Sequence, residues 1–297
     1  MDFSVARLRL WVLLLLLAPA LISCRAVAQE YSAERSATVP VDGATAVEVE
    51  ASAGTLIVEG ADIDRVEATG TARADDEDDL ENIQIRTARD GTTIRIEADL
   101  SDGGFMSGGN RSLDLTVRLP RGLSADIDDS SGDAEIRTLR GDRVDVNDSS
   151  GSLVIENIEA TMEVDDSSGD LEMRAITGDL DLDDSSGSIE LDGLNGEIII
   201  DDSSGDVRVS TSAGSLTVED SSGDIRVEAF DGDVLIEDDS SGDIRMRGVS
   251  GSVRVEEDSS GDIDVQDVGG DFIVEDDTSG DIRHSGVSGT VRIPDDR

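Results

Sequence analysis

From residue 134 onwards, apolar and polar residues alternate in short runs that recur along the chain. In each run two apolar residues stand two positions apart, as Leu153 and Ile155 do, and glycine-containing turns separate the runs. Alternation with a period of two is typical of a β-strand that buries one face. The pattern therefore predicts a chain built almost entirely of short strands.

The turns recur as regularly as the strands. The tetrapeptide Asp-Ser-Ser-Gly occurs nine times at intervals of 18 or 19 residues, with Thr278 replacing the first serine in the last copy. A second turn residue follows nine positions after each motif glycine, and it is glycine in every repeat except at Ala160. The repeating unit is thus two strands and two turns. The motif glycines are Gly132, Gly151, Gly169, Gly187, Gly205, Gly223, Gly242, Gly261 and Gly280.

This repeat predicts an all-β fold, a flat two-sheet β-solenoid with about 18–19 residues per coil and irregular coils at the N-terminal end. One coil cannot bury its own inner face, but a stack of coils at a spacing of about 4.8 Å can. A β-propeller is the competing architecture. It needs four strands in about 40 residues and large aromatic side chains in the core, and the solenoid accounts for the repeat better.

The regularity of the pattern divides the chain. Residues 126–297 are predicted to form the regular Asp-Ser-Ser-Gly solenoid, and residues 29–39 a polar tether. Residues 40–125 predict irregular N-terminal coils that cap the open end, since an uncapped sheet edge aggregates. Two insertions interrupt these coils, an acidic stretch at Asp75–Glu81 and a glycine-rich loop at Asp102–Gly109.

The N-terminus indicates export. Residues 1–28 have the positive end and short apolar run of a signal peptide, too short for a comfortable membrane span. Two cleavage sites compete. Leu21–Cys24 fits a bacterial lipobox, in which case the signal is 1–23 and Cys24 is lipidated, whereas Ala26–Ala28 fits ordinary signal peptidase. Either site predicts an exported protein of the periplasm, outer membrane or cell surface, with a lipid anchor in the first case.

The composition of the chain limits the classes of binding partner and of catalytic or metal site that it can have. The chain has 69 acidic and 24 basic residues, all of the latter arginine, and a formal charge of −45. Nucleic acid is excluded as a partner because the chain would repel a polyanion, and a membrane is expected only through the lipid anchor. With His284 as the single histidine and Cys24 as the single cysteine, no Cys/His metal cluster can form, and the sequence indicates no Ser-His-Asp triad. We therefore expect no catalytic residues and no organic cofactor.

The aspartates of the repeated motif are the sharpest candidate site. One interpretation is structural: each carboxylate accepts backbone N–H groups of its own turn, and glycine supplies the positive φ. The other is a ladder of Ca²⁺ ligands, because in-register carboxylates about 4.8 Å apart repel each other and hard cations prefer oxygen ligands. Both interpretations can hold together. The aspartates are Asp129, Asp148, Asp166, Asp184, Asp202, Asp220, Asp239, Asp258 and Asp277.

Arginines recur at outward positions three or five residues after the motif glycine. We expect them to neutralise neighbouring carboxylates rather than to form a ligand-binding stripe. His284 falls at an inward position of the last coil and is expected to be a partly exposed capping residue. The arginines are Arg137, Arg174, Arg208, Arg226, Arg245, Arg247 and Arg283.

These features together resemble a known family. A signal or lipobox, irregular opening coils, the segment Leu113–Gly122 and the repeated Ser-Ser-Gly-Asp-Ile-x-Val are similar to the bacterial putative-adhesin domain family. The resemblance covers nearly all of the chain after the signal. It implies an exported β-solenoid domain of unknown biochemical activity, and it supplies no catalytic or ligand residues.

The sequence thus predicts an exported, envelope-associated β-solenoid that acts as a binding or structural module without catalysis. The partner would be a surface ligand, a glycan or a protein. The alternative is a surface repeat protein that binds Ca²⁺ and is stabilised by the cation. A carbohydrate-active enzyme is the third possibility, because carboxylates are abundant everywhere in the chain.

Overall fold

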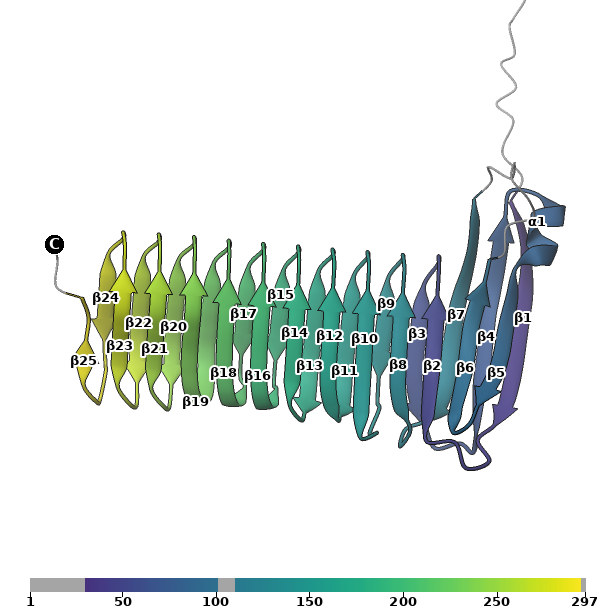
Figure 1. Cartoon of the computed structure of the whole chain (residues 1–297), viewed down its shortest axis with the longest axis horizontal. Coiled ribbons are helices and arrows are strands. Elements are labelled where there is room, and N and C mark those ends of the chain that lie inside the picture. Colours follow the sequence, from purple (N-terminus) through teal and green to yellow (C-terminus); the bar gives the residue numbers. More distant parts are fainter. Residues whose placement is uncertain (1–29, 101–109, 295–297) are drawn as a thin grey trace, which may run out of the picture.

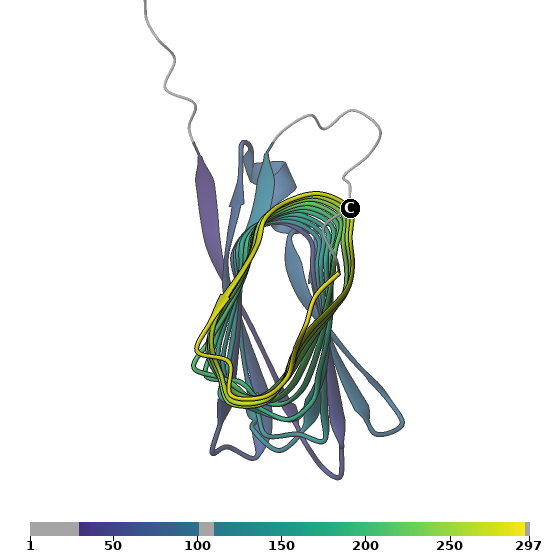
Figure 2. The ribbon, with the colours of Figure 1, turned by 90° about the vertical axis from the view of Figure 1, so that its left-hand side faces the viewer.

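The computed structural model describes residues 30–100 and 110–294. The chain winds into a rod of stacked coils (Figure 1), and each coil is an elongated oval with one strand on each long side (Figure 2). The strands on each side form a sheet, and the apolar side chains of both sheets meet in a single core. The predicted all-β, two-sheet solenoid of 18–19 residues per coil is confirmed.

The first sheet contains one strand from every regular coil, and its strands are parallel from β7 onwards. In spatial order it is β1 (Tyr31–Pro40), β4 (Arg65–Ala74), β7 (Arg111–Pro120), β3 (Leu56–Ala61), β9 (Ala134–Arg137), β11 (Leu153–Glu159), β13 (Leu171–Thr177), β15 (Ile189–Asp192), β17 (Val207–Ser210), the first part of β19 (Ile225–Asp239), β20 (Ile244–Val249), β22 (Ile263–Val268) and β24 (Ile282–Ser285).

The second sheet contains the other strand of every coil and is parallel from β6 onwards. In spatial order it is β5 (Gln84–Asp90), β6 (Thr93–Asp99), β2 (Ala46–Ala51), β8 (Ser124–Asp129), β10 (Arg143–Asp148), β12 (Thr161–Asp166), β14 (Leu180–Asp184), β16 (Asn195–Asp202), β18 (Ala213–Asp220), the second part of β19, β21 (Val253–Asp258), β23 (Phe272–Asp277) and β25 (Val291–Arg292).

Alternation along the strands builds the core. In β13, for example, Leu171 and Met173 are buried while the residues between and after them reach solvent. Because the strands pair in register, every inward position stacks on the same position of the next coil, as Leu171 does on Ile189. One exception is Ser212, which replaces an apolar corner residue: it is buried, and its hydroxyl donates to the Ser210 carbonyl and accepts the Leu194 N–H.

The Asp-Ser-Ser-Gly turn depends on its glycine. All nine motif glycines have φ between 122° and 148°, a region that is essentially closed to residues with a side chain. A Cβ on Gly205 would also overlap the carbonyl oxygen of Gly187 in the preceding coil. Serine links the turns along the rod, since the Ser204 hydroxyl donates to the Ser185 carbonyl at 3.1 Å. This corner is therefore fixed both by φ and by close backbone stacking.

The second turn is built differently from the expectation. In every coil a positive-φ residue comes six positions after the motif glycine, with φ between 52° and 73°. The glycine at nine positions is needed for close approach, and in three coils, at Gly178, Gly214 and Gly232, it also has a positive φ of 123° to 156°. Gly196, for instance, lies against the carbonyl of Gly178. The sequence concealed the real turn position because several residue types occupy it. They are Thr138, Asn157, Ala175, Gly193, Thr211, Ala229, Gly248, Asp267 and Gly286.

The strands of the N-terminal region are not stacked in chain order. The first coil, β2 and β3, lies between the coil of β6 and β7 and the first regular coil, β8 and β9. The chain therefore builds outwards to β7 and then crosses back to continue the rod from β8. The predicted division of the chain at residues 125 and 126 stays a prediction, since β8 spans it and both parts share the same two sheets.

A cap of antiparallel strands covers this end of the rod (Figure 1). The prediction of a tether at residues 29–39 is wrong for the described part, because residues 31–39 belong to β1 and pair with β4 along their whole length. The predicted glycine-rich loop at Asp102–Gly109 lies outside the described residues.

The acidic stretch at Asp75–Glu81 is mostly a short helix, α1 (Glu77–Asn82). Two arginines attach this helix to the cap. Arg35 donates to two carbonyls near the end of the helix, and Arg111 forms a buried ion pair with Asp79 at 2.8 Å. The insertion is therefore an integral part of the cap rather than a loose acidic segment.

The last coil exposes its inward positions. Val291 and Ile293, which occupy core positions of the repeat, are 36% and 38% exposed, because no further described coil stacks on them. His284 is exposed too, and its ring lies 6.0 Å from that of Phe272 in a tilted arrangement. The expectation of a partly exposed capping histidine is confirmed. Over residues 30–100 and 110–294, no helix is long and apolar enough to cross a membrane.

Candidate functional site

The motif aspartates form a row inside one corner of the rod. Eight of the nine side chains are buried, with at most 3% of the residue exposed, and Asp277 in the last turn is half-buried. Their carboxylates serve the turn: the N–H of Ser204 donates to Oδ1 of Asp202 at 2.9 Å. The same hydrogen bond, from the N–H of the serine two residues later to Oδ1 of the aspartate, occurs at Asp148, Asp166, Asp184 and Asp220 with lengths of 2.8 to 3.2 Å. The predicted turn chemistry is thus present in these five turns.

The second oxygen of each carboxylate has a different environment. Oδ2 of Asp148, Asp166, Asp184, Asp202 and Asp220 is buried without a hydrogen-bonding partner. A buried charge without a partner is costly, so the protonated form is favoured. Burial raises the pKa of Asp202 and Asp166 to about 6, with the carboxylate of Asp184 adding to the effect in both cases.

The effect is strongest at the sixth and seventh aspartates of the row. Burial raises the pKa of Asp220 to about 7, and the carboxylates of Asp202 and Asp206 add to the shift. Burial raises the pKa of Asp239 to about 8, assisted by the neighbouring rungs Asp258 and Asp220. The row therefore stores unfavourable charge that protons or cations would relieve.

The geometry places limits on cations. Within the described residues, no group of three or more His, Cys, Asp or Glu side chains is arranged to hold a metal ion. A cation in this row would therefore take its carboxylate ligands from two successive rungs, such as Asp202 and Asp220, which are paired in register. Ca²⁺ usually takes six to eight oxygen ligands, so the remaining ligands would have to be carbonyls or water.

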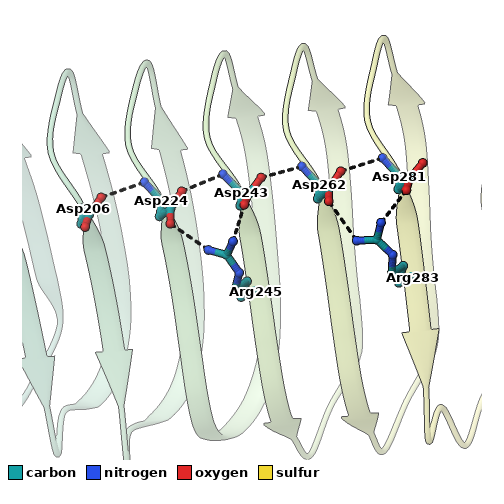
Figure 3. A network of polar contacts seen from close by, with 7 residues as sticks. All are labelled: Asp206, Asp224, Asp243, Arg245, Asp262, Asp281 and Arg283. Atoms are coloured by element: carbon teal, nitrogen blue, oxygen red, sulfur yellow. Dashed lines mark hydrogen bonds and ion pairs between the residues drawn. The ribbon is translucent and has the colours of Figure 1, made fainter.

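A second row of aspartates lies just beyond the motif glycines, at the surface (Figure 3). Each carboxylate accepts the backbone N–H of the equivalent residue in the next coil. Asp206 accepts from Asp224 at 3.0 Å, and Asp224 accepts from Asp243 at 3.0 Å. Asp243 and Asp262 continue the chain to Asp281. These aspartates therefore tie successive coils together.

Two arginines clamp this surface row in pairs. Arg245 bridges Asp224 and Asp243, and Arg283 bridges Asp262 and Asp281 (Figure 3). The N–H of Asp243, followed by Arg245, holds the pKa of Asp224 below its usual value. The N–H of Asp281, followed by Arg283, lowers the pKa of Asp262 in the same way. These carboxylates stay ionised, in contrast to the buried row.

The outward residues of the two sheets differ in charge. The outer surface of the first sheet between β9 and β24, here called the arginine face, carries all of the outward arginines expected from the sequence. Over the corresponding strands of the second sheet, β8 to β23, the outward arginines are Arg143 and Arg254. The outer surface of the second sheet is here called the acidic face.

The acidic face contains an unbroken column of carboxylates. Strand register stacks one acidic residue of each coil on the next from β12 to β23, and these side chains form no ion pair within the described part of the chain. Burial and the neighbouring carboxylates, Asp165 foremost, raise the pKa of Asp183. The column is Asp165, Asp183, Asp201, Glu219, Asp238, Glu257 and Asp276.

Only some arginines neutralise carboxylates. The expectation is confirmed for Arg137, Arg174, Arg245 and Arg283, each of which pairs with two acidic side chains. The other three form no ion pair within the described residues, although the charge of Arg226 adds to the lowering of the pKa of Asp224; they are Arg208, Arg226 and Arg247. Register accounts for Arg226, which stacks between Arg208 and Arg245. It does not account for Arg208 and Arg247, which stack beside Glu190 and Glu228 without forming an ion pair.

A comparison with known protein families establishes the family of this chain. The family model described as Toastrack DUF4097 matches residues 44–233, which run from the first coil into β19. The chain belongs to the Toastrack family. The family resemblance noted in the sequence, to an adhesin-type domain of unknown activity, agrees with this assignment.

Solved structures similar to this Toastrack chain carry related names. One is a putative cell adhesion protein from Clostridium sporogenes, with 11% identity and a TM-score of 0.30, covering 86% of this chain and 100% of that one. Another is a putative adhesin from Bacteroides fragilis, with 14% identity and a TM-score of 0.37, covering 88% and 96%. A third is a putative lipid binding protein from Parabacteroides distasonis, with 14% identity and a TM-score of 0.33, covering 88% and 97%.

Among curated proteins, no match was found. The three names above include no enzyme. Because the TM-scores are low, a function has to be inferred from the residues of the Toastrack chain itself. The candidate lipidation residue Cys24 and both predicted cleavage sites lie outside the described residues.

Two open grooves lie on the outside of the rod, one on each face. One, of about 230 Å³, lies on the arginine face across β19, β20 and β22. The other, of about 210 Å³, lies on the acidic face across β8, β10 and β12, and Asp126, Asp145 and Glu163 are among its lining residues. Both are on the outside of the sheets, so a ligand would rest on the surface of the rod rather than inside it.

Proposed function

We propose that this Toastrack chain is an exported, envelope-associated module that binds or supports other molecules through the flat faces of its rod, without catalysing a reaction. The single observation that carries the proposal is the separation of charge between two extended faces on one continuous core. The in-register pairing of successive coils, with a register shift after Val218 where β18 pairs with β19, makes these faces stiff and regular. Such surfaces suit recognition of an extended partner, because repeated side chains can meet a repeated ligand.

Export is tested by locating the full chain in a bacterial host. We expect it outside the cytoplasm, accessible to protease once the envelope is permeabilised or on intact cells if it reaches the surface. Cys24→Ser should release it from membrane pellets if Leu21–Cys24 is a lipobox. A processed protein that is already soluble and begins at Gln29 would instead support signal peptidase cleavage, and a cytoplasmic protein would refute the proposal.

A second candidate function is a rod stabilised by Ca²⁺. The observation in its favour is the buried carboxylate oxygen without a partner in each of the coils of Asp148, Asp166, Asp184, Asp202 and Asp220. If Ca²⁺ bridges the rungs, millimolar Ca²⁺ should raise the melting temperature of the purified protein by mass action. NaCl at equal ionic strength is the control. An equal rise with NaCl would mean that screening alone stabilises the row, and the calcium role would fail.

A further inference from the structure

The groove on the arginine face combines three kinds of side chain. It crosses three successive coils, so its polar residues form a small grid in which each row is one strand. The middle row holds two arginines, one outer row an arginine and a glutamate, and the other outer row an aspartate and a glutamine. The polar lining residues are Arg226, Glu228, Arg245, Arg247, Asp264 and Gln266.

The arginines of the groove are not equivalent. Arg245 is held in place by Asp224 and Asp243 (Figure 3). Arg226 and Arg247 form no ion pair within the described residues, although Arg247 donates to Oε1 of Gln266 at 2.6 Å. In a chain with a charge of −45, guanidinium groups that form no ion pair are unexpected, although the charge of Arg226 adds to the lowering of the pKa of Asp224. Their hydrogen-bond donors remain available to an anion.

The acceptors in the groove are also arranged. Gln266 donates from its amide nitrogen to Asp264 at 3.1 Å and accepts from Arg247, which fixes the orientation of the amide. Glu228 stacks directly beside Arg247 in the register of β19 and β20. Carboxylate and amide oxygens can accept hydrogen bonds from hydroxyl groups. The groove therefore offers cationic donors and neutral or anionic acceptors within two coil spacings, about 10 Å.

We propose that this groove binds a carboxylate-bearing sugar unit of an acidic oligosaccharide. The guanidinium groups of Arg226 and Arg247 would bind the sugar carboxylate, for which the planar fork of arginine is well matched. Glu228, Asp264 and Gln266 would accept hydrogen bonds from its hydroxyls. Small-molecule pockets usually have roughly 300–1,000 Å³, so a groove of about 230 Å³ suits one ring-sized unit.

The surroundings favour a short oligosaccharide over an anionic membrane. A membrane would have to contact the whole arginine face, which also carries Glu172, Glu190 and Asp192 on neighbouring coils. A short ligand touches only the groove, and at physiological ionic strength charges beyond about 8 Å are largely screened. This inference rests on the proposed binding role and names the class of ligand for one of its faces.

The test is calorimetric titration of the purified folded protein with a trimer of galacturonate, and with a trimer of galactose as the neutral control. We expect the acidic trimer to bind at least about 10-fold more tightly than the neutral one, the usual consequence of charge-assisted bonds. The double variant Arg226→Gln and Arg247→Gln should lose at least about 10-fold in affinity. Arg174→Gln, which alters a paired arginine on the same face, should change affinity less than about 2-fold.

The inference would be overturned by equal affinity for both trimers, or by equal losses of affinity in the double variant and in Arg174→Gln. It would also be overturned if the acidic trimer did not bind at a concentration of about 10 mM, because a dissociation constant above that value is too weak to be useful. Binding of vesicles rich in anionic lipid without binding of the acidic trimer would also overturn it. A circular dichroism spectrum and melting temperature close to those of the wild type would show that the variants fold. Failure here leaves the location of the protein unchanged, so the localisation experiment judges the broader proposal separately.

Discussion

The two corners of each coil reverse the chain in different ways, and their sequences differ accordingly. At the Asp-Ser-Ser-Gly corner the glycine has φ between 122° and 148°, and the tetrapeptide hardly varies. At the other corner the positive-φ residue has φ between 52° and 73°, and it is Thr, Asn, Ala, Asp or Gly. The second range is the left-handed helical region, which residues with a Cβ can adopt at a cost of about 1–2 kcal/mol. The regularity of a repeat therefore reflects how strictly its backbone conformation excludes other residues. The Asp-Ser-Ser-Gly corner is here called the strict corner, and the other corner of each coil the permissive corner.

The corners also differ in what they bury. The first places an aspartate inside the rod beside the same residue of the next coil, whereas the second buries an apolar side chain such as Ile176 or Phe230. Strict backbone geometry and unfavourable buried charge thus occur at the same corner. Changes of pH and single substitutions at each corner can separate these two contributions.

The largest effect should come from pH, because it acts on the whole buried row. The folded-state pKa values of Asp166, Asp202, Asp220 and Asp239 lie at about 6 to 8, above the ordinary value of 3.8. The folded protein therefore binds more protons than the unfolded chain in this window, and stability falls as pH rises from about 4 to 8. Each tenfold difference in proton affinity between the folded and unfolded states corresponds to about 1.4 kcal/mol per group.

Thermal unfolding at pH 5 and pH 8, at constant ionic strength and without divalent cations, measures this effect. The melting temperature should be higher at pH 5. Below about pH 4 stability should fall again, since Asp224 and Asp262 have lowered folded-state pKa values and lose their bonds to arginine on protonation. A melting temperature that is the same at pH 5 and pH 8 would show that the row is already neutralised in another way.

Glycine at the strict corner should be the most sensitive single position. Gly205→Ala places a Cβ in a forbidden φ region and against the carbonyl of Gly187, and should cost at least about 3 kcal/mol. Gly193→Ala at the permissive corner of the preceding coil should cost only about 1 kcal/mol, because its φ is 73° and no atom lies closer than 3.8 Å. Denaturant unfolding compares the two, and similar losses would contradict the distinction between the corners.

Charge at the strict corner should have a smaller effect of opposite sign. Asp202→Asn retains the acceptor for the Ser204 N–H but replaces the buried oxygen without a partner by an amide. At pH 8 and low salt, without Ca²⁺, we expect a gain of about 1 kcal/mol. Asp201→Asn, which changes the neighbouring outward residue, should stay within about 0.5 kcal/mol. A loss of both stability and Ca²⁺ response in Asp202→Asn would favour the calcium-stabilised rod instead.

Relief of strain at the permissive corner should give the smallest change. Thr211 is β-branched and has φ of 52°, so Thr211→Gly should stabilise the fold by up to about 1 kcal/mol, less the entropy that glycine loses on folding. Thr217→Gly, in the middle of β18, is the control and should destabilise by about 1 kcal/mol. Chemical denaturation of both variants should show opposite signs, and two losses would mean that Thr211 is not strained.

Much of the fold follows from local pattern. Inward residues such as Leu171 and Ile198 were identifiable because burial on one side of a strand requires apolar residues at every second position. The motif aspartates were identifiable as a row because their spacing equals the length of one coil. Their burial was not, since the same Asp-Ser-Ser-Gly turn can direct the carboxylate to either side of the chain. The true position of the second turn was hidden because Thr211 and Ala229 carry no turn signal.

By itself, the sequence determined the strand period, the coil length, the strict corner and the family, because each depends on residues close together in the chain. The tertiary structure alone decided that β2 and β3 stack between the coil of β6 and β7 and the rest of the rod, and that residues 31–39 pair with β4. It also decided that Arg226 and Arg247 form no ion pair within the described residues, while Arg174 does. These features depend on which strands become neighbours. Strand neighbours are chosen by backbone pairing between distant segments, and the local alternation of residues is the same whichever neighbour is chosen.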